Sequence, residues 1–301
     1  MRIEDIFVEA GFNLVLDAKT SLGECPVWSV AEQVLYFVDI KSRRIHRFDP
    51  ATNDLTTLEL SEEVGCIGLV AGGGFVAGLR SGIWLLDADG RPVRKLADNP
   101  EDRTISRFND GMVDPMGRFV AGTVDESREK GIAGLYRYDR NGLAQLADDL
   151  LTSNGVAFSP DGRRLYHADT LRYTLYTYDY APETGIASNR QVFSQFGSDT
   201  DKGRPDGGAV DLEGCYWTAL FEGGRVQRYS PDGALLAEYP VPVKCPTMVS
   251  FGGADMRTLY CTSASVGRSQ AELEAFPLSG GLFAMRTDVA GLQKPLFNPE
   301  A

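Results

Sequence analysis

The chain has 301 residues, 33 of them Gly, and carries a formal net charge of -12 with a pI near 4.7. This acidity disfavours nucleic acid and anionic membrane surfaces as partners, and the sequence holds no apolar run of about 18 residues that predicts a membrane span. Five scattered cysteines without a C-x-x-C pair, and a beginning that has acids but no continuous apolar stretch, predict a cytoplasmic protein with reduced thiols rather than a secreted one.

A short apolar segment that ends in a turn recurs six times along the chain. The copies begin at residues 24, 66, 109, 154, 206 and 247, so that the steps between them are 42, 43, 45, 52 and 41 residues. They read ECPVWSVAE, CIGLVAGGG, NDGMVDPMG, NGVAFSPDG, DGGAVDLEG and TMVSFGGAD. A period in the forties is typical of propeller blades. The copies contain no W-D dipeptide, so the WD40 type is not indicated.

Each copy is followed by further short strands. LYRYD after the third copy and VQRYS after the fifth alternate apolar and polar residues, which indicates half-buried strands. The sequence therefore predicts an all-β fold, a six-bladed β-propeller with four antiparallel strands per blade, as a single domain over residues 1–301. We expect the strand near Asn13 to Asp17 to close the ring by pairing with the last blade, because an open ring would leave an exposed edge.

The repeat places six equivalent residues at one rim of the central channel. Four of them carry oxygen ligands, and the six are Glu24, Cys66, Asn109, Asn154, Asp206 and Thr247. Two carboxylates in a narrow channel repel each other unless a cation neutralises them, and carboxylate and amide oxygens suit hard divalent ions. Asn-Gly and Asp-Gly are also strong turn dipeptides, but turn chemistry does not require Glu24.

Other candidate sites are less favoured by the sequence. Neither His46 nor His167 falls at a rim position, so a His-rich zinc site is not expected. Ser153 precedes a rim residue, but no His–Asp partnership for a serine-hydrolase triad is evident. Cys25 is interpreted as a small packing residue.

Several motifs resemble the senescence marker protein/gluconolactonase/regucalcin family, and within it the bacterial sugar lactonases such as L-arabinolactonase, xylonolactonase and gluconolactonase. They are LGECPVW at 22–28, RFNDGMVDPMGRFVAGT at 107–123, SNGVAFSPDG at 153–162, RPDGGAVDLEG at 204–214 and FGGADMRTLYCTSA at 251–264. The resemblance runs from about residue 13 to the C-terminal region.

The resemblance implies one divalent metal ion, with Ca²⁺, Zn²⁺, Mn²⁺ and Fe²⁺ as candidates, bound by Glu24, Asn154 and Asp206. It also implies that Asp206 doubles as general base and that Arg107 and Asn109 contact the sugar. The family's further acidic residue falls in GTVDES, where Glu126 is the candidate and Asp125 the competitor.

The expected activity is hydrolysis of a small-molecule sugar lactone, an aldonolactone, to its aldonic acid, with the metal polarising the lactone carbonyl. No obligate protein partner is evident. Two alternatives stay open. A metal–oxygen clamp of this kind also suits a phosphotriester (organophosphate) hydrolase, and a propeller with a bound metal need not be catalytic.

Overall fold

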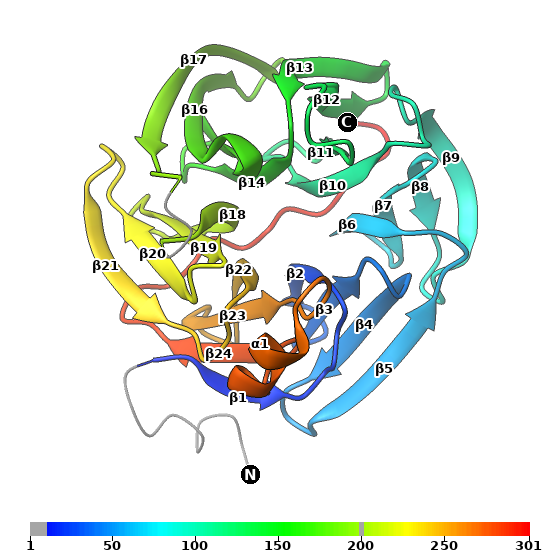
Figure 1. The fold of residues 1–301 in the computed structure, drawn as a ribbon. Coiled ribbons are helices and arrows are strands. Elements are labelled where there is room, and N and C mark those ends of the chain that lie inside the picture. Colours follow the sequence, from blue (N-terminus) through cyan, green and yellow to red (C-terminus); the bar gives the residue numbers. More distant parts are fainter. Residues whose placement is uncertain (1–10, 199–201) are drawn as a thin grey trace.

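The computed structural model describes residues 11–198 and 202–301, which form a ring of six four-stranded sheets (Figure 1). Neighbouring strands within each sheet are antiparallel. The predicted six-bladed β-propeller is thereby confirmed. Residues 1–10 and 199–201, which the predicted domain over 1–301 includes, lie outside the described residues.

Within each of the first five blades the strands run outward from the channel in chain order. Their bounds are as follows: β2 (Gly23–Ser29), β3 (Val34–Asp39), β4 (Arg44–Asp49) and β5 (Asp54–Glu59) in blade 1; β6 (Val64–Leu69), β7 (Phe75–Leu79), β8 (Gly82–Leu86) and β9 (Pro92–Asp98) in blade 2; β10 (Ser106–Val113), β11 (Phe119–Asp125), β12 (Ala133–Asp139) and β13 (Gly142–Leu150) in blade 3; β14 (Ser153–Phe158), β15 (Arg164–Asp169), β16 (Thr174–Ala181) and β17 (Ile186–Gln195) in blade 4; and β18 (Arg204–Val210), β19 (Tyr216–Phe221), β20 (Arg225–Tyr229) and β21 (Leu235–Pro240) in blade 5.

The sixth blade joins the two ends of the ring. It consists of β22 (Pro246–Gly252), β23 (Thr258–Ser263), β24 (Leu282–Arg286) and, as its outermost strand, β1 (Asn13–Leu16). Because β1 pairs antiparallel with β24, the first strand of the chain holds the last blade in place. The closure predicted for the segment near Asn13 is confirmed, and it removes the free edge that an open ring would present.

The core lies between the blades. The innermost strands are buried along almost their whole length, whereas the outer strands β5 and β21 are largely exposed. Stacked aromatic pairs join adjacent blades, with ring centroids 5.8 Å apart for Trp28 and Tyr260 and 4.8 Å apart for Tyr166 and Tyr216. Apolar residues on both faces of a strand thus pack against two neighbours, which explains the continuous apolar runs of the repeat.

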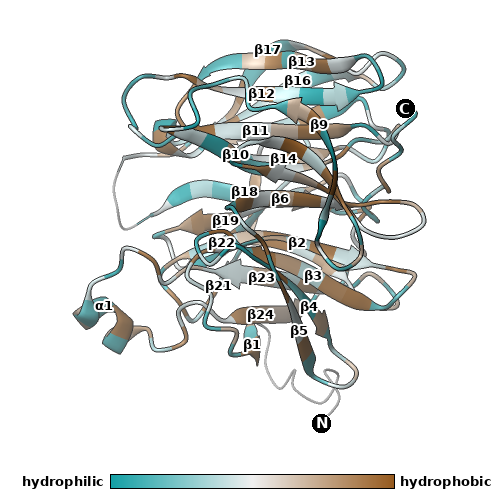
Figure 2. Cartoon of the chain, turned by 90° about the vertical axis from the view of Figure 1, so that its right-hand side faces the viewer, coloured by the Kyte–Doolittle hydropathy of each residue, from teal (hydrophilic) through white to brown (hydrophobic). Residues whose placement is uncertain are grey.

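The two faces of the ring differ. A short helix, α1 (Gln270–Ala275), stands out from one face, and the segment after β24 crosses the opposite one (Figures 1 and 2). That segment is tied to several blades, for example by Leu292 N–H donating to the Val210 carbonyl and by Phe297 N–H donating to the Leu69 carbonyl. No helix among the described residues is long and apolar enough to cross a bilayer.

Every innermost strand carries an irregularity near its rim residue. The pairing with the second strand of the blade shifts register there, between Glu24 and Val27 in β2 and between Asn154 and Ala157 in β14, and the other four blades repeat it. The residues that follow Glu24 and Asn154 are Cys25 and Gly155, with φ of 45° and 62°. A bulge frees a residue from the ladder and turns its side chain, so this shared device directs the rim side chains toward the channel.

At Gly155 this geometry leaves no room for a side chain. A Cβ there would lie 2.9 Å from the carbonyl oxygen of Asp206 and would also collide with the Tyr216 hydroxyl. Gly267 has a similar φ, 72°, but open space around it.

Replacing Gly155 with Ala should therefore lower the free energy of unfolding by roughly 3 kcal/mol, the sum of left-handed strain and overpacking. Gly267→Ala, which adds only the backbone strain, should cost about 1 kcal/mol. Urea denaturation of both variants measures the difference. Equal losses in the two proteins would show that close packing around Gly155 does not constrain the rim.

Candidate functional site

The mouth of the channel on the α1 side opens into a cavity of about 620 Å³. All four oxygen-bearing rim residues line it: Glu24, Asn109, Asn154 and Asp206. The other two rim positions do not. Cys66 is fully buried, and the Thr247 hydroxyl donates a hydrogen bond of 2.5 Å to the Gly23 carbonyl of the adjoining blade. The structure thus brings together the four residues that the repeat register singled out.

Glu24 and Asp206 are buried like charges. Their exposed fractions are 7% and 5%. Burial raises the pKa of Glu24 well above its usual range, and Asp206 and Asp110 raise it further by repulsion, against the hydrogen bond from Cys25 N–H and the charge of Arg107. Burial and Asp110 likewise raise the pKa of Asp206. The charged form of each carboxylate is thus disfavoured when the other carboxylates are charged.

The third carboxylate, Asp110, was not singled out by the sequence reasoning. It directly follows the rim residue Asn109, and it is 2% exposed. Its Oδ1 accepts from Gly111 N–H at 2.7 Å and its Oδ2 from Val156 N–H at 3.1 Å. Both oxygens of Asp110 are therefore engaged by the backbone of two blades, which gives this carboxylate a structural task.

Asp206 differs from Asp110 in one respect. Its Oδ1 is buried and has no hydrogen-bond partner among the described residues. A buried carboxylate oxygen without a donor is costly, and a cation beside it would remove that cost together with the repulsion from Glu24. Two carboxylates and the amide oxygens of Asn109 and Asn154 are hard oxygen donors, so the residues present fit a divalent ion such as Ca²⁺ or Mn²⁺.

A second acidic group, Asp211, Glu213 and Cys215, also brings possible ligand atoms within 4.8 Å of one another. It lies in the turn between β18 and β19, at the end of β18 away from the cavity. Asp211 already accepts hydrogen bonds from the backbone N–H groups of Glu213 and Cys215 and from Trp217 Nε1, and its Oδ2 pairs with Arg228 at 2.8 Å. These contacts account for its burial without an ion.

A chain of hydrogen bonds fixes the two rim amides. Arg107 Nη1 donates to Asn109 Oδ1, Asn109 Nδ2 donates to Asn154 Oδ1, Asn154 Nδ2 donates to Thr170 Oγ1, and Thr170 donates to the Pro205 carbonyl, each at 2.7 Å. The chain starts at a guanidinium, which can only donate, and ends at a carbonyl, which can only accept. The orientation of both amides, and with it the direction of the Asn154 oxygen, is thereby determined.

Thr170 belongs to a short 3₁₀ turn, Thr170–Arg172, directly after β15. Sequence reasoning missed its part in the site, because no motif marks it. Only the fold brings this turn beside Asn154 of the same blade and Pro205 of the next.

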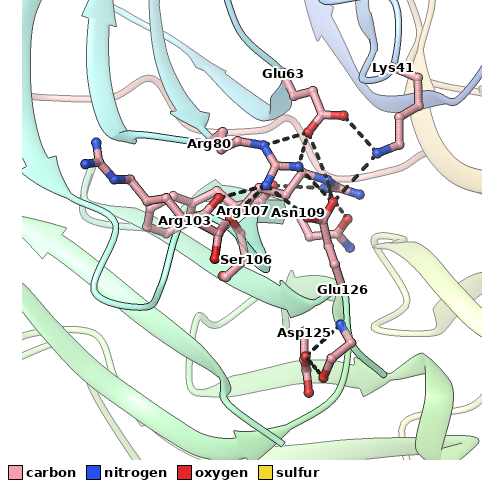
Figure 3. A network of polar contacts seen from close by, with 12 residues as sticks. Lys41, Glu63, Arg80, Arg103, Ser106, Arg107, Asn109, Asp125 and Glu126 are labelled. Atoms are coloured by element: carbon pink, nitrogen blue, oxygen red, sulfur yellow. Dashed lines mark hydrogen bonds and ion pairs between the residues drawn. The ribbon is translucent and has the colours of Figure 1, made fainter. Parts of the chain in front are cut away.

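Charged side chains from blades 1, 2 and 3 form one network beside the cavity (Figure 3), and Lys41, Arg107 and Glu126 of this network line the cavity. Arg80 Nη2 lies 2.5 Å from Glu63 Oε2 and 2.8 Å from Glu126 Oε1, and Lys41 Nζ lies 2.8 Å from Glu63 Oε1. Arg107 Nε lies 3.7 Å from Glu126. This network was also not anticipated, since its members are far apart in the sequence and only Arg107 and Glu126 carry motif signals.

The structure separates the two acidic candidates of the third blade. Asp125 is fully buried, and its carboxylate accepts hydrogen bonds from the backbone N–H groups of Ser127, Lys130 and Gly131. Both residues line the cavity, but the Glu126 side chain is 28% exposed and its carboxylate pairs with the side chain of Arg80. Burial raises the pKa of Glu126, but the hydrogen bond and charge of Arg80 outweigh it, so the net shift is downward and the group is charged at neutral pH.

Ser153 and His167 form a pair that sequence reasoning did not detect. Ser153 Oγ lies 2.7 Å from His167 Nε2, and both residues are fully buried. His167 Nδ1 has no hydrogen-bond partner among the described residues, and burial lowers the pKa of this imidazole to about 3. A catalytic triad needs an acid at that nitrogen and access to substrate. Among the described residues this serine and histidine therefore do not form one.

Comparison with known proteins places this geometry among relatives. Residues 22–265 match the family model described as SMP-30/Gluconolactonase/LRE-like region. The chain is 52% identical over 277 residues to the 6-deoxy-6-sulfogluconolactonase of Pseudomonas putida, covering 92% of this chain and 94% of that one. It is 34% identical to the pentonolactonase XacC of Haloferax volcanii, covering 95% and 97% of the two chains. The structure superposes with a TM-score of 0.91 and 28% identity on the crystal structure of regucalcin, a calcium-binding protein from Agrobacterium tumefaciens, covering 96% and 97% of the two chains.

The carboxylate arrangement predicts opposite effects of two conservative substitutions on the metal-free protein. In chelator at neutral pH, Asp206→Asn should raise the melting temperature by a few degrees, because it removes one buried like charge from an oxygen that has no donor. Asp110→Asn should lower it, because an amide NH₂ cannot accept from a backbone N–H. Thermal melts followed by circular dichroism measure both. A lower melting temperature for Asp206→Asn than for the wild type would mean that the repulsion at the rim is not a cost to the fold.

Proposed function

The chain belongs to the SMP-30/gluconolactonase/LRE-like family, and from this premise we propose that it hydrolyses a sugar lactone to the aldonic acid with the help of one divalent metal ion. The observation that carries the proposal is the unpartnered, buried Oδ1 of Asp206, which shares a cavity with a second buried carboxylate, Glu24. A polar rim of this kind serves a small ligand rather than a protein surface.

Glu24, Asn154 and Asp206 would hold the ion through their side-chain oxygens. Bound there, a divalent ion would polarise the lactone carbonyl and stabilise the negative charge that develops on its oxygen. The hydrogen bond from Asn154 Nδ2 to Thr170 and the one that Asn154 Oδ1 accepts from Asn109 fix the orientation of the Asn154 amide, so that this ligand is oriented before an ion arrives.

Asp206 also has the properties of the general base. Its Oδ1 receives no protein proton, and its pKa is raised from its ordinary value by burial, which makes it a better proton acceptor than an exposed aspartate. It would take a proton from the attacking water as the water oxygen bonds to the carbonyl carbon. The bond from that carbon to the ring oxygen then breaks, and the ring oxygen takes up the proton.

Arg107, Asn109 and Glu126 would hold the sugar. Arg107 and Asn109 are rigid, since each is 8% exposed or less and both belong to the chain of hydrogen bonds that crosses the rim. Glu126, whose carboxylate lies 3.7 Å from Arg107 Nε, offers a charged acceptor to sugar hydroxyls. Groups fixed in this way orient the ester relative to the base, which is where much of the acceleration of an enzyme originates.

The substrate set for testing follows from the relatives. Pentonolactones and hexonolactones belong in it, and so does a lactone with a sulfonate at C6, because the Pseudomonas putida relative is named for one. Phosphotriesters test the alternative that the same donor set serves phosphoryl transfer.

We expect acid release from an aldonolactone, followed with a pH indicator, to stop in chelator and to return with Ca²⁺, Mn²⁺, Zn²⁺ or Fe²⁺. Asp206→Ala at saturating metal should lower kcat by at least about 100-fold, because the base is lost, while the circular dichroism spectrum stays that of a β-protein. Glu213→Gln, in the second acidic group, should keep both the activity and the metal content. Substantial turnover by Asp206→Ala would contradict the mechanism, and cleavage of phosphotriesters without lactone cleavage would contradict the substrate class.

Asp125 and Glu126 should separate into a structural and a substrate-binding residue. Glu126→Gln should raise KM for the lactone and leave the melting temperature within a degree or two, because its carboxylate lies on the cavity wall. Asp125→Asn should lower the melting temperature, because three backbone N–H groups lose their acceptor. Steady-state kinetics and thermal melts of both variants test this. A KM defect in Asp125→Asn with unchanged kinetics in Glu126→Gln would transfer the role to Asp125.

A further inference from the structure

A second group of charges lines the cavity on the side of blades 5 and 6. Arg204 is the first residue of β18, Glu222 directly follows β19, and Arg268 lies between β23 and α1. Arg204 Nη2 donates to Glu222 Oε2 at 2.6 Å, and Arg268 Nη1 donates to Glu222 Oε1 at 2.8 Å. One carboxylate therefore holds two guanidinium groups side by side at the edge of the cavity that contains Asp206.

The hydrogen bonds to Glu222 hold both arginines in place but do not use all of their N–H donors. The two guanidinium groups have five N–H donors each, and the bonds to Glu222 use a single nitrogen of each. The Nε of both residues has no hydrogen-bond partner among the described residues. A second carboxylate, Glu272 of α1, lies 3.5 Å from the same Arg268 nitrogen, but it does not line the cavity. At this edge of the cavity the two guanidinium groups share the carboxylate of Glu222, and Asp206, in the same strand as Arg204, is a further acidic group of the lining.

An aromatic ring fixes the planes of both groups. The guanidinium carbons of Arg204 and Arg268 lie 5.3 Å and 5.6 Å from the centre of the Phe221 ring. Their side chains are each 17% exposed, so little rotational freedom remains to be lost when a ligand binds. Two planar forks held against one ring form a preorganised site for an anion with several acceptor oxygens.

The net charge of the molecule bears on what such a site would bind. The chain has a net charge of -12, so a negatively charged substrate approaches against the overall field unless cations are gathered where it binds. A neutral sugar offers hydroxyl groups, for which paired guanidinium groups are not required. Arg204 also stands only two residues before Asp206 in the same strand, which places the pair next to the reacting end of the cavity.

We propose that Arg204 and Arg268, held by Glu222 and Phe221, bind an anionic substituent of the lactone, a sulfonate or a phosphate at C6, the carbon attached to the ring carbon that bears the ester oxygen. The inference rests on the proposed function, and it adds the chemical class of the substrate and the residues that select it. The same contacts could merely anchor the segment before α1 to blade 5, and the test separates these two roles.

The test compares three substrates: glucono-1,5-lactone and its C6-sulfonated and C6-phosphorylated forms. The wild type should show a higher kcat/KM for at least one charged lactone than for the neutral one, and the two charged forms distinguish sulfonate from phosphate. In Arg204→Met and in Arg268→Met the ratio of charged to neutral kcat/KM should fall about ten- to a hundredfold, the scale of a lost charge-assisted hydrogen bond, mainly through KM. Arg204→Lys, which keeps the charge without the fork, should give an intermediate ratio. Arg225→Met, which breaks an Arg–Glu pair outside the cavity, should keep the wild-type ratio.

A wild type that prefers the neutral lactone, or a ratio that both Met variants leave unchanged, would overturn the proposal. An equal loss for charged and neutral lactones together with a lowered melting temperature would assign the arginines to structure and would overturn it as well. If the wild type cleaves no lactone at all, the proposed function fails separately. The anion site is then tested by calorimetric titration with the ring-opened C6-sulfonated aldonate. Binding to the wild type that is lost in Arg268→Met supports the site. No binding to the wild type overturns it.

Discussion

The repulsion between carboxylates buried at the mouth of the channel is the constraint around which the rest of the site is arranged. Glu24, Asp110 and Asp206 approach one another from three blades. Asp110 and Asp206 raise the pKa of Glu24, and Asp110 raises the pKa of Asp206. A fold does not collect like charges in a poorly solvated place without something to offset them. Here backbone N–H groups satisfy Asp110, whereas Asp206 keeps one oxygen bare. We propose that this difference between two neighbouring carboxylates makes the rim a site for a cation.

The propeller brings these carboxylates together through a β-bulge that recurs in its inner strands. All six inner strands shift register near the same position, and this position holds the rim residue of each blade. The six copies differ in sequence, so the side chain at the rim position has a different role from blade to blade. Four rim side chains line the cavity, while Cys66 and Thr247 pack into the ring wall. Charged side chains of both signs line the rest of the cavity, among them Arg107, Arg204 and Arg268.

The fold and the rim could be predicted from the sequence, because a repeat period and a register are properties of the chain alone. The register places Glu24, Asn154 and Asp206 at one rim, and the need to cover an open edge predicts the closure through Asn13. Contacts that depend on how blades meet could not be predicted in this way. Thr170 and Arg80 reach the site from turns of unrelated sequence, and the pairing of Ser153 with His167 depends on side-chain directions in adjacent strands. The preference for Glu126 over Asp125 stays a proposal, and it likewise depends on which carboxylate the backbone already occupies.

The central claim, that the rim carboxylates form a metal site, is tested most directly by a crystal soaked in Mn²⁺ and measured near the manganese absorption edge. We expect one strong anomalous peak in the mouth of the channel, within coordination distance of oxygens from Glu24, Asn154 and Asp206. A peak only between Asp211, Glu213 and Cys215, or none at the rim at saturating Mn²⁺, would contradict it.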